Sequence, residues 1–89
     1  MTTSKLFTIE DEEYIDKLLG LVKGELKLAV EKFPPFHSAH EGYAIIREEV
    51  DELWEDVKAN KGYDVAFNEA IQVAAMAVRY LYDLHGKKY

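Results

Sequence analysis

The sequence predicts an all-α protomer of three helices that assembles with copies of itself into a helical bundle. Apolar residues recur at intervals of three and four along three long segments, which predicts helices at residues 9–32, 39–59 and 65–85. The third segment is apolar around most of its circumference, and two neighbouring helices are too few to cover it. We therefore expect a subunit interface there, in a dimer or a tetramer. The 89 residues fit one domain, 1–89, whose small core would gain stability from association.

Capping and breaking residues mark the ends of the three predicted helices. The predicted N-caps are Thr8, Ser38 and Asp64. Glu41 stands three residues after Ser38, as in a capping box, where the glutamate reaches back to the backbone of the capping residue. Pro34 and Pro35 end the first helix, and Gly86 is expected to end the third.

The apolar residues of the first two helices form one stripe each. The stripe of the first helix comprises Ile15, Leu18, Leu19, Val22, Leu26, Ala29, Val30 and Phe33. The stripe of the second comprises Tyr43, Ile46, Val50, Leu53 and Val57. We expect both stripes to face the core. Tyr43 and Trp54, which flanks the second stripe, could stack on a nucleobase, but a place in the core is the expected one.

The composition argues against several classes of function. The net charge of −6 disfavours binding to nucleic acid, since phosphate backbones need clustered Lys and Arg. The chain has no cysteine, which excludes disulfides and thiolate metal sites. No apolar run approaches about 20 residues, and the first ten residues lack the apolar segment of a signal peptide. We therefore expect a cytoplasmic protein that does not associate with membranes.

The second predicted helix carries a cluster of acidic residues. Those on one face are Glu41, Glu48, Glu52 and Glu55. Glu49 lies between this face and the apolar stripe, three positions from Glu52, so these two carboxylates are neighbours that repel each other. A hard cation such as Mg²⁺ would reverse the sign of this interaction, because it prefers oxygen ligands. On spacing alone, a solvated acidic surface remains the favoured interpretation.

Glu69 is an acidic residue on the otherwise apolar third helix, and Gln72 follows one turn later. An isolated buried carboxylate is costly, so it needs a partner. That partner could be a metal ion shared with the second helix, or a cation such as Arg79. The alternative is that Glu69 faces solvent near the start of its helix.

Two motifs in these helices resemble those of the MazG-like all-α nucleoside triphosphate pyrophosphohydrolases. The family has Glu-Glu-x-x-Glu in one helix and Glu-x-x-Asp in the next. This chain has Glu48-Glu49-Val50-Asp51-Glu52, and then Glu69-Ala70-Ile71-Gln72. The similarity covers residues 40–84, about half of the chain.

The resemblance implies a site that holds Mg²⁺, or Mn²⁺ in its place, against the phosphates of a nucleotide. Carried over to this chain, the ligands would be Glu49, Glu52, Glu69 and Gln72. Gln72 departs from the family's aspartate. Its neutral amide oxygen is a weaker ligand, and the site has one negative charge fewer.

The resemblance also implies a reaction, the hydrolysis of a nucleoside triphosphate to the monophosphate and pyrophosphate. Glu48 or Glu49 would act as the general base. The side chain that neutralises phosphate charge would be Arg47, Lys58 or Arg79, and the sequence does not choose among them. The alternative is a catalytically degenerate MazG-like bundle that binds a nucleotide or a metal, or acts as an oligomeric interaction module. Gln72 and the short chain favour this alternative.

Overall fold

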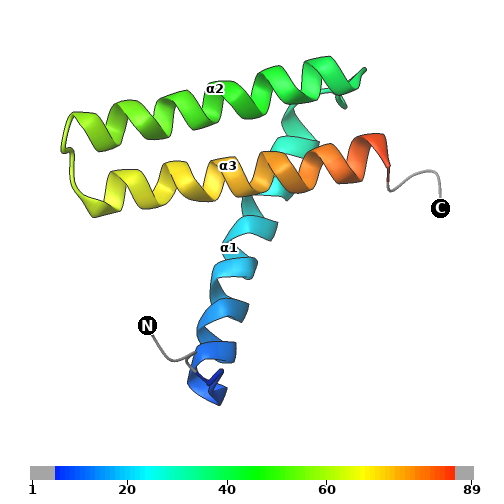
Figure 1. Cartoon of the computed structure of the whole chain (residues 1–89). Coiled ribbons are helices and arrows are strands. Elements are labelled where there is room, and N and C mark those ends of the chain that lie inside the picture. The colour runs from blue at the N-terminus through cyan, green and yellow to red at the C-terminus, as the bar shows by residue number, and fades with distance from the viewer. Residues whose placement is uncertain (1–5, 86–89) are drawn as a thin grey trace.

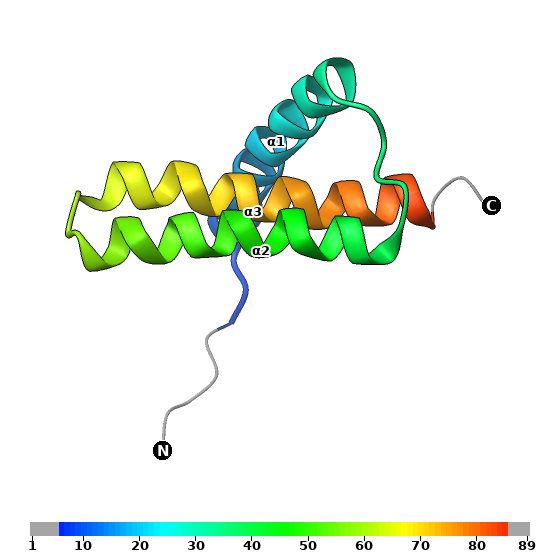
Figure 2. The same cartoon turned by 90° about the horizontal axis from the view of Figure 1, so that it is seen from above.

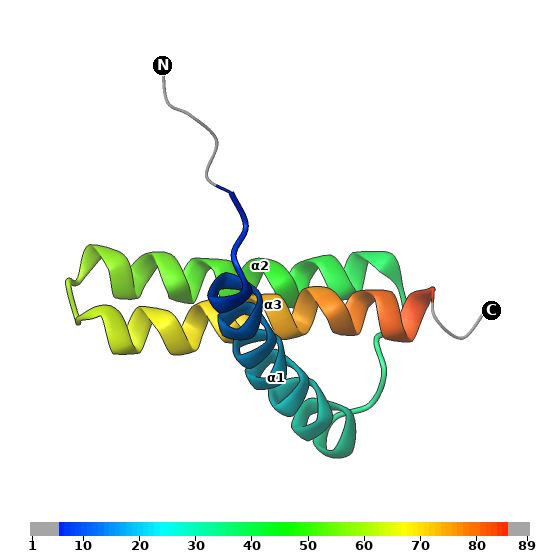
Figure 3. The same cartoon turned by 90° about the horizontal axis from the view of Figure 1, so that it is seen from below.

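The computed structural model describes residues 6–85 and folds them into three helices. They are α1 (Ile9–Lys32), α2 (Ala39–Lys58) and α3 (Tyr63–Leu84), and residues 6–85 contain no strand. α2 and α3 pack side by side as an antiparallel hairpin (Figures 1 and 2). α1 crosses one side of this hairpin and packs on α3 but not on α2 (Figures 1 and 3). The predicted all-α fold of three helices is confirmed. None of the described helices is long and apolar enough to cross a membrane.

Hydrogen bonds from side chains define the starts of α1 and α2. Thr8 caps α1 in a full capping box, in which its hydroxyl accepts from the Asp11 N–H and the Asp11 carboxylate accepts from the Thr8 N–H, both at 3.0 Å. Ser38 caps α2, since its Oγ accepts from the Glu41 N–H at 3.1 Å. The predicted return hydrogen bond, from the Ser38 N–H to the Glu41 carboxylate, does not form. The carboxylate accepts instead from the N–H of His37 at 2.6 Å, one residue earlier.

The start of α3 differs from the prediction. Gly62 is the N-cap, with no side-chain hydrogen bond, and Asp64 lies inside the first turn. The connection from α2 turns back through two residues with left-handed φ angles, Asn60 at 54° and Gly62 at 104°, and this tight turn starts the helix before Asp64 can cap it. The acidic side chain still stabilises the first turn through the helix dipole. Gly86, the predicted stop of α3, lies outside the described residues.

The buried core of the described chain is small. It comprises Val22 from α1 and Ala75 and Met76 from α3, with half-buried apolar residues packed around them. Tyr43 and Trp54 are 60% and 56% exposed, so the prediction that they lie in the core is wrong for the single chain. The rotation of α2 about its axis turns Gly42, Ile45 and Glu49 inward. Of the predicted stripe, Ile46 packs against the core and Leu53 is half-buried, whereas Tyr43, Val50 and Val57 are exposed. Of the α1 stripe, only Val22 is buried.

Gly42 marks the closest approach between the two helices of the hairpin. A Cβ atom at this position would lie 2.7 Å from the Tyr80 ring and 3.0 Å from the Phe36 ring. Such distances are too short for any side chain, so only glycine permits this packing. The two rings thereby fix the start of α2 against the end of α3.

A buried arginine ties α1 to α3. Arg79 is only 2% exposed and donates from Nε to Asp83, from Nη1 to the Ala29 carbonyl, and from Nη2 to two further carbonyls, all within 3.0 Å. Those two carbonyls belong to Phe33 and Pro34. The guanidinium therefore adds a second hydrogen bond to the Ala29 carbonyl, which already accepts from the Phe33 N–H, and supplies donors to two carbonyls just beyond the end of α1. Asp83 also accepts from the Phe36 N–H at 2.9 Å, which holds the connection between α1 and α2 in place.

Candidate carboxylate site between the second and third helices

Three carboxylates predicted as metal ligands meet between α2 and α3. They belong to Glu49 and Glu52 on α2 and Glu69 on α3, and one oxygen of each lies within 4.8 Å of the others. The i, i+3 spacing brings the first two together on one face of α2. The antiparallel packing of the hairpin brings Glu69 opposite them. We refer to these three residues as the carboxylate cluster.

The electrostatics of the carboxylate cluster are unfavourable without a bound cation or proton. Oε2 of Glu69 is buried and has no hydrogen-bond partner. Burial raises the pKa of Glu69 to about 7, with further contributions from the negative charges of Glu49 and Glu52. Burial is also the main cause of a raised pKa at Glu49, followed by repulsion from Glu52. Near neutral pH, Glu69 therefore shares a proton with its neighbours or needs a positive charge between them.

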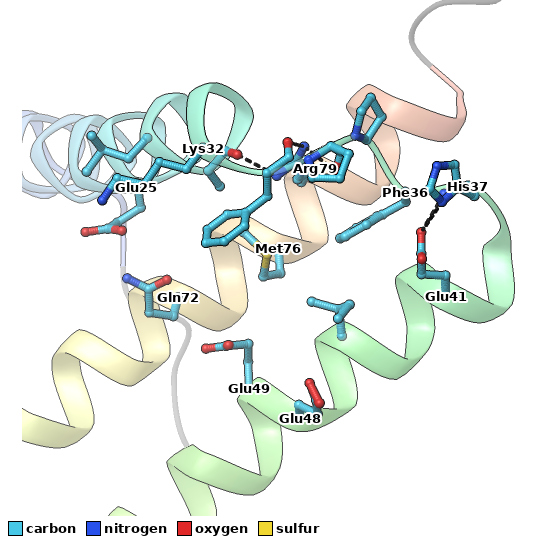
Figure 4. Close-up of a pocket in the computed structure, with 16 residues that line it drawn as sticks. Glu25, Lys32, Phe36, His37, Glu41, Glu48, Glu49, Gln72, Met76 and Arg79 are labelled. Atoms are coloured by element: carbon cyan, nitrogen blue, oxygen red, sulfur yellow. Dashed lines mark hydrogen bonds and ion pairs between the residues drawn. The ribbon is translucent and has the colours of Figure 1, made fainter.

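Gln72 lies one helical turn beyond Glu69 and is half-buried. It lines a cavity together with Glu49, and the two side chains come from α3 and α2 to the same side of the hairpin (Figure 4). Its position is thus compatible with the predicted fourth ligand. Its amide can offer a neutral oxygen to a cation, or donate an N–H to a carboxylate.

The cavity beside the carboxylate cluster has a volume of about 440 Å³ and involves all three helices. Its apolar wall includes Leu28 from α1, Phe33 and Phe36 from the following connection, Ile45 from α2 and Met76 from α3. Its polar side chains are Glu25, Lys32, His37, Glu41, Glu48, Glu49, Gln72 and Arg79 (Figure 4). This volume is within the range of small-molecule pockets, which typically combine an apolar wall with a few polar groups.

The two predicted general bases lie in different surroundings. Glu49 belongs both to the carboxylate cluster and to the cavity wall. Glu48 lines the cavity but is not one of the three clustered carboxylates. Glu41, farther along the same wall, accepts from His37, and this backbone hydrogen bond is the main cause of its lowered pKa.

The predicted phosphate-binding cations do not converge on the cavity. Arg47 bonds to Tyr43 and Asp51, and it does not line the cavity. Lys58 also lies elsewhere, 3.0 Å from Glu55 and over the Trp54 ring. Arg79 lines the cavity, but its guanidinium is occupied by Asp83 and by three backbone carbonyls. The structure thus gives Arg79 a part in the fold rather than the predicted contact with phosphate.

The predicted site residues do not include those that line the cavity from the end of α1 and the connection to α2. Among these are Lys32, Phe36 and His37. Lys32 is the useful cation among them, because no ion pair involves it within residues 6–85. No periodicity predicts these positions, since they depend on how α1 crosses α3. Pro34 and Pro35 were the available signal, because two prolines in succession stiffen the connection that carries Phe36 and His37.

No protein-family profile, no curated protein and no solved structure matches this chain. The resemblance to the MazG-like pyrophosphohydrolases stays a prediction.

Proposed function

We propose that the protein is a metal-dependent nucleoside triphosphate pyrophosphohydrolase that binds Mg²⁺, or Mn²⁺, at the carboxylate cluster. The observation that carries the proposal is the buried Oε2 of Glu69, which has no partner and lies opposite Glu49 and Glu52. Oxygen ligands of this kind suit hard divalent cations. The donor set therefore fits the metal that the sequence resemblance implies, with the Gln72 amide oxygen as the fourth ligand.

In this proposal, residues of the carboxylate cluster and of the cavity have different roles. Bound Mg²⁺ would neutralise and polarise the phosphates. Glu49 would accept the proton of the attacking water, because its carboxylate belongs to both the cluster and the cavity wall. Lys32 lines the adjacent cavity from α1 and offsets part of the negative charge of its acidic wall. The products would be the nucleoside monophosphate and pyrophosphate.

The direct test is a screen for released pyrophosphate. The purified protein is incubated with each common nucleoside triphosphate and with Mg²⁺ or Mn²⁺. We expect turnover of at least one nucleotide, loss of turnover with chelator, and loss in the variant that carries both Glu49→Gln and Glu52→Gln. Absence of turnover with every nucleotide and both metals would contradict the enzymatic proposal.

Gln72 favours a second candidate function, a degenerate bundle that binds metal and nucleotide without hydrolysis. An amide in place of a carboxylate lowers the negative charge of the site and so weakens its hold on a cation. This candidate keeps the carboxylate cluster and the cavity but lacks the reaction. The pyrophosphate screen separates the two candidates, because both predict cation binding and only one predicts turnover.

The substitution Gln72→Asp should strengthen binding of Mg²⁺ by about tenfold, which corresponds to about 1.4 kcal/mol. The new carboxylate would add negative charge beside Glu49, which lines the same cavity. Without metal the same change adds repulsion, so the apo protein should lose stability. Calorimetric titration with Mg²⁺ measures the first effect and thermal unfolding the second. Unchanged metal affinity would place residue 72 outside the metal site and would contradict the match to the family's fourth ligand.

A second copy of the chain is the partner we propose for the apolar surface of the hairpin. The exposed apolar residues of α2 are Tyr43, Val50, Trp54 and Val57, which fall on one stripe. α3 contributes Phe67, Val78, Leu81 and Tyr82. Such a surface suits helix-on-helix packing between protomers. Sedimentation at micromolar concentration should show a dimer or tetramer with no major monomer, and Trp54→Glu should shift the distribution toward monomer. A stable monomer of the parent protein would contradict this proposal.

A further inference from the structure

The cavity beside the carboxylate cluster is lined by acidic side chains, which repel the phosphates of a nucleotide but not its uncharged base. Its carboxylates belong to Glu25, Glu41, Glu48 and Glu49. Of its two cationic side chains, Arg79 is neutralised by Asp83 at 2.9 Å, which leaves Lys32. A triphosphate carries several negative charges and is repelled from such a wall unless a cation accompanies it. If the proposed function holds, the phosphates therefore stay at the cluster and the base faces the cavity.

The apolar wall of the cavity suits a flat ring. Phe36, Ile45 and Met76 come together from three different segments of the chain. The Phe36 ring is held in place, because the Arg79 guanidinium lies 5.4 Å from its centroid and Asp83 accepts from its backbone N–H. A rigid aromatic side chain next to aliphatic ones is a favourable surface for a nucleobase.

Among the carboxylates of this wall, Glu48 is the one whose oxygens can accept hydrogen bonds from a ligand. Glu41 already accepts from the N–H of His37, and Glu49 belongs to the carboxylate cluster. Glu48 takes part in no hydrogen bond or ion pair within residues 6–85. It stands on α2 next to Glu49, and Figure 4 places both carboxylates at the same side of the cavity. A base that extends from the cluster into the cavity would therefore meet Glu48.

We propose, on the basis of the proposed function, that Glu48 selects nucleotides whose base carries an exocyclic amine. The Glu48 carboxylate can only accept hydrogen bonds while it is ionised, so it needs a donor. Cytosine presents an amine at position 4, where uracil presents a carbonyl oxygen, and a carboxylate is the natural acceptor for that amine. Uracil or thymine would leave two acceptors facing each other without a proton between them, which costs binding free energy. Adenine and guanine carry exocyclic amines as well and belong to the accepted class.

The test compares binding of CTP and UTP in forms that resist cleavage between the α- and β-phosphates. The α,β-imido analogues of both nucleotides are titrated calorimetrically into the full chain with Mg²⁺. We expect the cytosine analogue to bind about tenfold more tightly or better. In Glu48→Gln this ratio should fall toward one, because the new amide can donate to the uracil carbonyl. Glu55→Gln is the matched control, since it removes one α2 carboxylate outside the cavity and should keep the parent ratio.

Inorganic tripolyphosphate with Mg²⁺ separates failure of this inference from failure of the proposed function. If tripolyphosphate binds and the two analogues bind equally, the selection of amine-bearing bases is refuted while the metal-phosphate site stands. If neither tripolyphosphate nor any analogue binds, both proposals fall. If the parent prefers the cytosine analogue but Glu48→Gln keeps the full preference, Glu48 is not the selecting residue and the inference is refuted. The corresponding analogues of ATP and GTP then show which amine-bearing base is preferred.

Discussion

Replacement of Asp83 by alanine should lower the free energy of unfolding by about 3–5 kcal/mol, because it leaves the charge of Arg79 buried without its counter-ion. The two side chains are 3% and 1% exposed and lie 2.9 Å apart. The change also removes the acceptor for the Phe36 N–H. A domain of this size is stabilised by only about 5–15 kcal/mol, so the loss is a large part of the total. Urea or thermal unfolding followed by circular dichroism measures it.

The chain offers a matched control for this prediction. Arg47 and Asp51 form another Arg–Asp pair at i, i+4, but their side chains are 61% and 63% exposed and 3.5 Å apart. Asp51→Ala should therefore change the stability by less than about 1 kcal/mol, since exposed pairs contribute little. Equal effects of the two substitutions would show that burial of the Arg79–Asp83 pair is not important for the fold.

The role of Arg79 also illustrates what the sequence could not predict. Its backbone acceptors lie 45 to 50 positions earlier in the chain, and nothing in local spacing connects them. From the sequence, Arg79 lies in the narrow polar stripe of an otherwise apolar helix, which made it a candidate partner for Glu69 or for phosphate. The crossing of α1 over α3 decides between these options, and that crossing is a property of the assembled core.

The helices themselves were predictable because periodicity, caps and prolines act locally. α1 and α2 begin where Thr8 and Ser38 predict. The rotation of α2 about its axis was not predictable, since its apolar stripe and the face that includes Gly42 both qualify as packing surfaces. In the structure, the face that includes Gly42 packs against α3, because the Tyr80 ring occupies the space that a side chain at position 42 would fill. The exposure of Tyr43 and Trp54 follows from this packing.

The candidate site was predictable in part. The spacing within α2 predicts that Glu49 and Glu52 are neighbours, and the resemblance adds Glu69 from the next helix. The structure brings these three together. The burial of the Glu69 oxygen and the acidic cavity next to it depend on tertiary packing, so no sequence pattern predicts them. From sequence spacing alone, only the proximity of Glu49 to Glu52 within α2 could be predicted.

The double substitution of Glu49 and Glu52 by glutamine should abolish the stabilisation of the protein by divalent cations. At a Mg²⁺ concentration about a hundred times its dissociation constant, the parent should gain about 2.7 kcal/mol, and the variant should gain nothing measurable. The reason is that two of the three clustered carboxylates lose their charge. Without metal the variant should be at least as stable as the parent, because repulsion with Glu69 is relieved. Thermal unfolding with and without Mg²⁺ measures both effects.

The pH dependence of folding stability is a second test of this prediction, and the direction of the change follows from the pKa of Glu69. The pKa of Glu69 is raised from 4.5 to about 7 in the folded chain, so the folded state binds more protons than the unfolded state between these values. Stability of the metal-free parent should therefore fall as pH rises from about 4.5 to about 7, then level off. The stabilisation by Mg²⁺ should grow over the same range, because the cation competes with the proton on Glu69.

In the double variant the fall in stability with pH should become shallower without disappearing, because burial remains the largest cause of the raised pKa at Glu69. The control removes two charges from α2 away from the cluster, by Asp51→Asn with Glu55→Gln. It should keep both the cation effect and the parent pH profile. A cation effect that survives in the Glu49 and Glu52 variant, or that the control also loses, would mean that cations stabilise the protein through its general acidity. The carboxylate cluster would then be an acidic surface and not a metal site.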